Sequence, residues 1–206
     1  MAPKRAAMSS EPSLVEARAA LRRAHIQRRR ELPLGVQQQA SEALAERLVP
    51  LLQDARVIGV YAAIRGEISL DPLLRTLPDR RWCWPKVGDE QKLHFVEATP
   101  CELSSGAYGI LEPPTRECTP LLTLDAILVP GSAFTRDGGR LGMGGGFYDR
   151  VLPLLRTDCP ILGVGYDWQV VDTLPLLPHD HKMTYVVTDL RTLLCAPEPL
   201  AAGDSP

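Results

Sequence analysis

The stretch DAILVPGSAFTRDGGRLGMGGGFYDRVLPLL, residues 125–155, carries the clearest structural information in the chain. It opens with a short apolar run over 125–131 that is typical of a buried strand and ends in Pro-Gly. Six glycines then fall within the nine positions 138–146, and YDRVLPLL continues into a predicted helix that Pro153 is placed to distort. A strand, a glycine-rich loop and a helix in succession favour an α/β sheet, in which ligands gather beyond the carboxyl ends of the strands.

The rest of the chain alternates in the same way. A helix is predicted from Ser13, a suitable N-cap, to Glu31, with Pro33 as its stop. The other predicted elements are helices over 36–53 and 68–77 and strands over 55–63, 81–87, 92–98, 160–166 and 184–189. This order predicts an α/β fold with three α/β/α layers and a mostly parallel mixed sheet, in a single domain over 13–195. The two ends, 1–12 and 196–206, are rich in Pro, Ala, Ser and Gly and are predicted to be disordered tails.

The composition argues against several classes of protein. The 206 residues are 45% hydrophobic with a formal net charge of −2, so no overall field favours nucleic acid or an acidic membrane surface. No apolar run approaches the length of a membrane span, and the N-terminal residues lack the apolar core of a secretory signal. The five cysteines are odd in number and show no metal-binding spacing. We therefore expect a soluble cytoplasmic protein with reduced thiols.

The glycine segment fits neither common phosphate-binding motif. A P-loop needs Lys-Ser or Lys-Thr after its glycines, and a dinucleotide fingerprint needs a third glycine where this chain has Phe147 or Asp149. The physical principle still applies, because glycines let main-chain N–H groups converge on an anion. Arg140 adds a guanidinium fork, Tyr148 a ring for a planar ligand, and Asp149 a carboxylate for Mg²⁺. The alternative interpretation is a solvated turn with an Asp149–Arg150 pair.

Residues 129–150, VPGSAFTRDGGRLGMGGGFYDR, resemble the hallmark segment of the 5-formyltetrahydrofolate cyclo-ligase family, also called methenyltetrahydrofolate synthetases. The resemblance runs from about residue 14 to 190. It includes the paired basic residues Arg18 and Arg22 on the first helix and, in the right order, RGEISLDPLL (65–74), YGILEP (108–113) and GYDWQVVDTLPLLPHD (165–180).

Membership of this family implies an enzyme that uses MgATP to close 5-formyltetrahydrofolate into 5,10-methenyltetrahydrofolate, with release of ADP and phosphate. The formyl oxygen would attack the γ-phosphate, and the phosphorylated imidate would then be closed by nitrogen 10. Two alternatives stay open: a non-catalytic nucleotide- or RNA-binding module, and an ATP-using enzyme with another N-formyl substrate. One short basic run, 28–30, on a chain of charge −2 is weak support for nucleic acid. We expect a monomer with a small-molecule substrate, no nucleic acid and no membrane partner.

The resemblance also implies roles for individual residues. ATP contacts are expected from Arg18, Arg22, Arg140, Leu141, Gly142, Met143, Gly144, Gly145, Gly146, Phe147 and Tyr148. Folate contacts are expected from Ala62, Glu67, Gly144, Gly145, Gly146 and Phe147, and magnesium ligands from Asp149 and Asp180. On chemical grounds Arg140 is assigned to the transferred phosphoryl group.

The chain also departs from the family pattern and offers some alternatives. Phe147 replaces a frequent Tyr, and Met143 and Gly145 stand where some members carry basic residues, so this loop has less positive charge. The histidines beside Asp180 lack the further partners of a zinc site. The remaining arginines of the first helix, Arg23, Arg28 and Arg30, are expected on the surface, and Arg29 extends the Arg18–Arg22 face. Core or pocket-wall positions are expected for Tyr61, Trp82, Trp84 and Phe95.

Overall fold

The structure is a computed structural model, and it describes residues 13–88, 92–106 and 109–195. The two predicted tails, 1–12 and 196–206, therefore lie outside the described residues, as does Tyr108.

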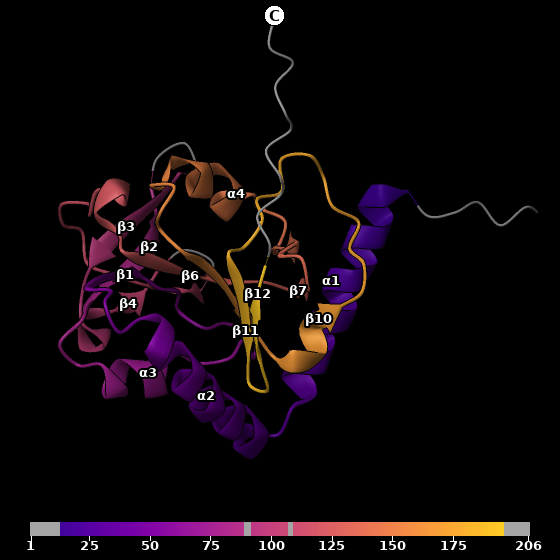
Figure 1. The fold of residues 1–206 in the computed structure, drawn as a ribbon, viewed down its shortest axis with the longest axis horizontal. Helices are drawn as coiled ribbons and strands as arrows, with labels where there is room; N and C mark the ends of the chain where they lie inside the picture. The colour runs from indigo at the N-terminus through magenta and orange to yellow at the C-terminus, as the bar shows by residue number, and fades with distance from the viewer. Residues whose placement is uncertain (1–12, 89–91, 107–108, 196–206) are drawn as a thin grey trace, which may run out of the picture.

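A seven-stranded sheet forms the centre of the fold (Figure 1). The strands run in the order β12 (Thr192–Leu194), β11 (Tyr185–Thr188), β9 (Ile161–Gly165), β6 (Ala126–Pro130), β1 (Val57–Gly59), β2 (Arg81–Val87) and β3 (Leu93–Glu97). The five inner strands are parallel, and the edge strands β12 and β3 pair antiparallel with their neighbours. The prediction of a mostly parallel mixed sheet is confirmed.

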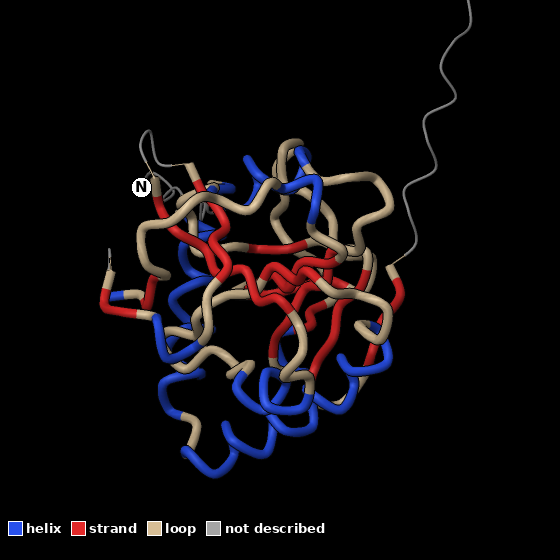
Figure 2. The backbone as a smooth tube through the Cα atoms, turned by 90° about the vertical axis from the view of Figure 1, so that its left-hand side faces the viewer, coloured by secondary structure: helices blue, strands red, loops and turns tan. Residues whose placement is uncertain are grey.

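Helices cover both faces of this sheet. These are α2 (Leu34–Leu48), α3 (Asp71–Thr76) and α4 (Phe147–Val151), whereas α1 (Leu14–Glu31) lies elsewhere. Figure 1 shows α2 and α3 on one side of the sheet and α4 on the other. In the view of Figure 2, a group of helices lies below the strands. Alternate residues of one strand serve the two faces, since Leu128 packs in the core with α2 and α3 whereas Ile127 packs in the core with Val151 of α4. This is the predicted three-layer arrangement.

The first helix is confirmed, and it stands beside the end of the sheet instead of covering a face (Figure 1). Ser13 and Glu16 form a capping box at its start, and it ends at Glu31, two residues before Pro33. The second helix is shorter than predicted. It ends at Leu48 and gives way to the 3-10 turn η1 (Val49–Leu51), because Pro50 cannot donate its main-chain hydrogen bond to a longer helix.

The strand predicted over 55–63 is observed only over Val57–Gly59. A tight turn follows, in which the Glu67 N–H donates to the Ile64 carbonyl at 2.9 Å. Its two central residues, Arg65 and Gly66, have φ values of 51° and 75°. Positive φ at both positions defines a mirror-image turn that no strand could continue through. The chain from 60 to 67 is therefore free to form one wall of a cavity.

The glycine segment follows a different strand from the one predicted. After β6 the chain first forms a hairpin of β7 (Ala133–Thr135) and β8 (Arg140–Leu141), which joins β10 (Val170–Val171) in a separate three-stranded sheet. The hairpin turns at Gly138, whose φ is 88° and where a Cβ would lie 2.5 Å from the Met183 carbonyl oxygen. The segment then feeds the five-residue α4, and Pro153 lies in the 3-10 turn η6 (Leu152–Leu154) that follows, as the predicted distortion required.

The remaining elements are short. They are a two-stranded sheet of β4 (Ser104–Ser105) and β5 (Leu111–Glu112) and the 3-10 turns η3 (Pro100–Glu102), η5 (Leu121–Thr123) and η7 (Asp167–Gln169). The core prediction is confirmed for all four aromatic residues, Tyr61, Trp82, Trp84 and Phe95, which are buried. All five cysteines are free thiols. Within the described ranges, no helix combines the length and the apolar character that crossing a membrane requires.

Candidate active site

One cavity of about 630 Å³ collects nearly every residue that the sequence singled out. It lies beyond the carboxyl ends of β1, β2 and β6, where a parallel sheet is expected to bind ligands. The predicted residues that line it are Arg18, Arg22, Ala62, Glu67, Arg140, Gly142, Met143, Gly144, Gly145, Gly146, Phe147, Tyr148, Asp149 and Asp180. Leu141 is the exception: it is fully buried in the core, so its side chain is not a ligand contact.

Helix α1 supplies two arginines to one end of the cavity. Residues four apart share a helix face, so Arg18 and Arg22 both point away from solvent. The Arg18 guanidinium holds the Asp180 carboxylate through two hydrogen bonds, of 2.5 and 3.0 Å. Arg22 Nε donates to the Gly142 carbonyl oxygen at 2.8 Å and so fixes the start of the glycine segment. The three other arginines predicted to lie on the surface, Arg23, Arg28 and Arg30, are exposed.

Arg140 lies at the centre of the same end. It is only 3% exposed, and its Nη2 donates to Asp149 Oδ1 at 2.7 Å while Nη1 donates to the Pro130 carbonyl at 3.2 Å. Its guanidinium carbon lies 5.5 Å from the centre of the Tyr148 ring, and its buried Nε has no partner. A guanidinium at a cavity wall is suited to an anionic ligand.

The main chain of the glycine segment offers further donors. In the described part of the chain, the N–H groups of Gly144, Gly145 and Gly146 donate to no protein acceptor. Gly144 and Gly146 have φ values of 103° and 65°, which side chains other than glycine rarely allow. Two carbonyl oxygens are occupied instead, since Gly142 accepts from Arg22 and Gly145 from Arg150. Arginines thus hold the oxygens of the loop and leave its N–H groups available.

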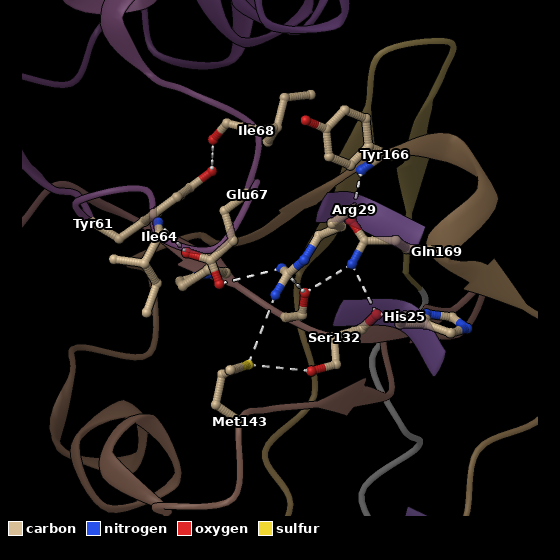
Figure 3. A network of polar contacts seen from close by, with 12 residues as sticks. His25, Arg29, Tyr61, Ile64, Glu67, Ile68, Ser132, Met143, Tyr166 and Gln169 are labelled. Carbon is tan, nitrogen blue, oxygen red and sulfur yellow. Dashed lines mark hydrogen bonds and ion pairs between the residues drawn. The ribbon is translucent and has the colours of Figure 1, made fainter. Parts of the chain in front are cut away.

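The cavity also has an apolar wall and one buried acid. The wall gathers residues from five segments: Ala62, Ile64, Pro85, Val87, Leu93, Ile110 and Phe147. Glu67, which is 8% exposed, accepts at Oε2 from the Ile64 N–H at 3.1 Å and at Oε1 from Arg29 Nη1 at 3.3 Å (Figure 3). Burial raises the pKa of Glu67, and the Arg29 charge is the largest influence that lowers it.

Charge and burial also shift the pKa values of Asp180, His181 and Tyr148. Burial acts to raise the pKa of Asp180, but hydrogen bonds from Arg18 and the Leu177 N–H outweigh it, so the pKa lies below its usual value. Burial lowers the pKa of His181, which also senses Asp149 and Arg140. Burial likewise raises the pKa of Tyr148 far above its usual value, so its hydroxyl keeps its proton.

The two carboxylates predicted to bind magnesium both face the cavity, and each is paired with an arginine predicted to bind phosphate. In the described ranges no three His, Cys, Asp or Glu side chains come together as a self-sufficient metal site. Two carboxylates nevertheless fit Mg²⁺, which prefers oxygen ligands and commonly takes the rest of its shell from water and substrate phosphates.

Two features of the site were not expected from the sequence. Arg29 is fully buried against Glu67, 38 residues away, although its place on the Arg18–Arg22 face was a usable signal. The apolar wall gave no signal, because it takes single residues from the ends of separate strands and turns. His179, beside Asp180, also lines the cavity.

The structure is that of an α/β protein with a cavity at the carboxyl edge of a mostly parallel sheet, lined by arginines, glycines and apolar side chains. The model of the 5-formyltetrahydrofolate cyclo-ligase family matches residues 14–189, and the chain belongs to that family of enzymes. The resemblance stated from the glycine segment is thereby confirmed.

Individual relatives agree with the family. The 5-formyltetrahydrofolate cyclo-ligase of Mycolicibacterium smegmatis is 34% identical over 184 residues, which is 84% of this chain and 94% of the relative. The Escherichia coli K12 cyclo-ligase is 34% identical over 172 residues, covering 79% and 94%. The solved 5,10-methenyltetrahydrofolate synthetase of Aquifex aeolicus matches with a TM-score of 0.77 and 28% identity, over 90% of this chain and 98% of that chain.

Proposed function

We propose that this enzyme uses ATP to convert 5-formyltetrahydrofolate to 5,10-methenyltetrahydrofolate; the names of its relatives contain these two folates. The observation that carries the proposal is the union in one cavity of an arginine- and glycine-lined end with an apolar wall that contains a buried acid. A triphosphate suits the first part, and a reduced pterin with its N–H donors suits the second. We also propose that the enzyme acts as a monomer in the cytoplasm.

The chemistry requires activation of an amide oxygen. The formyl oxygen attacks the γ-phosphorus, the bond from that phosphorus to the β-phosphate oxygen breaks, and ADP leaves. Nitrogen 10 then attacks the formyl carbon of the phosphorylated imidate and loses its proton, and the carbon–oxygen bond breaks to release phosphate. ATP is needed because oxide is a poor leaving group and phosphate a good one. Positioning and charge neutralisation supply most of the acceleration in such transfers.

In this proposal Arg140 contacts the transferred phosphoryl group. Its fork lies beside the glycine segment, because a Cβ on Gly142 would lie 2.7 Å from Arg140 Nη1. The free N–H groups of Gly144, Gly145 and Gly146 bind phosphate oxygens, and Arg18 and Arg22 contribute charge from α1. Arg18 pairs with Asp180, and Arg140 pairs with Asp149. Each ion pair orients the guanidinium and balances its charge before ATP binds.

Asp149 and Asp180 are the residues that would hold Mg²⁺ in company with phosphate oxygens and water. The ion would neutralise charge on the transferred phosphoryl group. The chain's own part is to hold both carboxylates in position, through the ion pair that each one makes with an arginine.

Glu67 is proposed to accept hydrogen bonds from the pterin ring, whose amino and ring N–H groups a carboxylate can accept as a pair. Ala62 and Phe147 then border the ring, and the lack of a hydroxyl on Phe147 leaves that contact apolar. The ring would thus lie between the acid and the glycine segment.

The proposal is tested by mixing the purified protein with MgATP and 5-formyltetrahydrofolate and following the near-ultraviolet absorbance of the methenyl product. ADP and phosphate should form in equal amounts with it, and omission of either substrate should abolish all three. ATP consumption with a different N-formyl compound, and none with this one, would favour an enzyme for another N-formyl substrate. Binding of ATP or RNA with no folate-dependent turnover would favour the non-catalytic module.

A further inference from the structure

Arg29 is the largest fully buried side chain of the described residues, although it carries a charge. It extends from α1 behind the cavity wall, where Nη1 lies 3.3 Å from Glu67 Oε1 and 3.4 Å from the Gly131 carbonyl oxygen. Its Nη2 lies 3.9 Å from the sulfur of Met143, in the glycine segment (Figure 3). One guanidinium therefore touches the carboxylate of the apolar end, the end of β6 and the loop of the cationic end.

These contacts are poor as a stabilising device. A buried arginine needs short hydrogen bonds on most of its donors to offset its loss of water, yet its contacts here are long and the buried Nε has no partner. Replacing such a pair with apolar side chains is often neutral or stabilising. The presence of these two buried charges, Arg29 and Glu67, beside the cavity therefore points to a role in ligand binding.

The neighbours of Arg29 restrict how it can move. Gln169 Nε2 donates to the carbonyls of Gly131 and Ser132 at 2.9 and 2.8 Å, and the Ser132 hydroxyl lies 3.4 Å from the Met143 sulfur. A Cβ on Gly66 would lie 2.8 Å from the Arg29 carbonyl oxygen, so the turn that carries Glu67 packs directly on α1. The guanidinium and the acid are thus held from both sides.

We propose that Arg29 is a positioning residue for folate binding: its buried guanidinium holds the Glu67 carboxylate in place at the cavity wall. This rests on the proposed role of Glu67 in contacting the pterin. Arg29 does not line the cavity, so it acts on the substrate only through its neighbours.

The surroundings of Glu67 explain why it needs this partner. Burial alone drives its carboxyl group toward the neutral form, which could donate one hydrogen bond but could no longer accept a pair. The other charged or titratable groups whose fields reach it are Arg65 on its own turn, Tyr61 after β1, Tyr148 on α4 and Tyr166 after β9. The tyrosines all keep their protons at neutral pH, because burial raises the pKa of each. Arg65 is exposed to solvent, which leaves Arg29 as the buried positive charge.

The test compares the pH dependence of the KM for 5-formyltetrahydrofolate in wild type, Arg29→Met, Arg29→Lys and Glu67→Gln. Acidification should raise the KM as Glu67 becomes protonated. In Arg29→Met, which removes the opposite charge, this rise should occur at a pH about 1–3 units higher than in wild type. Arg29→Lys, which keeps the charge, should stay near the wild-type profile. Glu67→Gln should show a raised KM without that titration. The KM for ATP should change less than twofold in all of them.

The double variant of Arg29→Met and Glu67→Gln distinguishes positioning of Glu67 from general damage to the fold. It also provides a second measurement if Arg29→Met alone does not fold. If Arg29 acts through Glu67, then Arg29→Met adds no further loss in folate KM to Glu67→Gln, and the two effects are not additive. Arg30→Met, an exposed neighbour on the same helix, serves as the matched control and should behave as wild type. An unshifted pH profile in Arg29→Met, or additive losses in the double variant, would overturn the role of Arg29. A wild type that forms no methenyl product would instead overturn the proposed function.

Discussion

The substitution Gly142→Ala tests the proposed catalytic position of Arg140 without touching its charge. The added Cβ would lie 2.7 Å from Arg140 Nη1, and ordinary van der Waals contact begins at 3.4 Å. The guanidinium must therefore retreat by about 0.7 Å. A misplacement of about 1 Å at a reacting centre can lower a rate by about 10²-fold, so we expect kcat to fall by one to two orders of magnitude.

The loss should appear in catalysis and not in folding. The atom that must move is the far end of a side chain, and Gly142 has no positive φ that alanine would strain. The melting temperature should therefore stay within a few degrees of wild type. Methenyl absorbance gives kcat, and differential scanning fluorimetry gives the melting temperature.

Gly35→Ala is the matched control for this experiment. Nothing lies within 4 Å of a Cβ at that position on α2, so kcat should be unchanged; the melting temperature should stay the same or rise, because Ala favours a helix more than Gly does. A Gly142→Ala enzyme with unchanged kcat would refute the assignment of Arg140 to the transferred phosphoryl group. A large drop in its melting temperature would show that the loop, and not the guanidinium, takes up the strain.

Three further substitutions test other contacts. Arg140→Ala should lower kcat by about 10²–10³ while the protein stays folded by circular dichroism, and near-normal turnover would contradict its role. Asp180→Asn should destabilise the fold by about 1.5–3 kcal/mol near neutral pH, because the carboxylate accepts two bonds from Arg18. Folding lowers the pKa of Asp180, so this stabilisation is complete above the pKa of the unfolded state, about 3.9, and is lost as the pH falls through the pKa of the folded state. The free energies of unfolding of the two proteins in urea should therefore converge in acid. Gly66→Ala should lower the free energy of unfolding by at least about 1–2 kcal/mol, because φ is 75° and the new Cβ would meet the Arg29 carbonyl; an unchanged urea midpoint would contradict this.

The strands and helices of the main sheet could be predicted because each depends on signals inside its own segment. The segments 81–87 and 92–98 are rich in aromatic and apolar residues on either side of a turn signal, and the first strand is observed over Arg81–Val87 as predicted. The short strands β7, β8 and β12 were not predicted. Each has two or three residues and exists only because a partner strand, supplied by the fold, completes its hydrogen bonds.

The residues that line the site could also be predicted, but the ion pairs that they form with one another could not. Arg140, the two aspartates and four of the glycines stand out by residue type or by resemblance, and all of these line the cavity; the glycines are Gly142, Gly144, Gly145 and Gly146. Nothing in the sequence says that Arg18 will meet Asp180 across 162 positions. A helical period of 3.6 residues tells which arginines share a face but not what that face meets.

By itself the sequence determined the layered α/β class, the family and the presence of a glycine-rich loop, because these depend on local composition and spacing. Only the tertiary structure decided that a buried guanidinium on α1 stands behind Glu67 and that both candidate metal ligands are held by arginines. The physical reason is that electrostatic and steric effects depend on distance in space, and the chain brings α1, the turn at 64–67 and the glycine segment together only when it folds around the sheet.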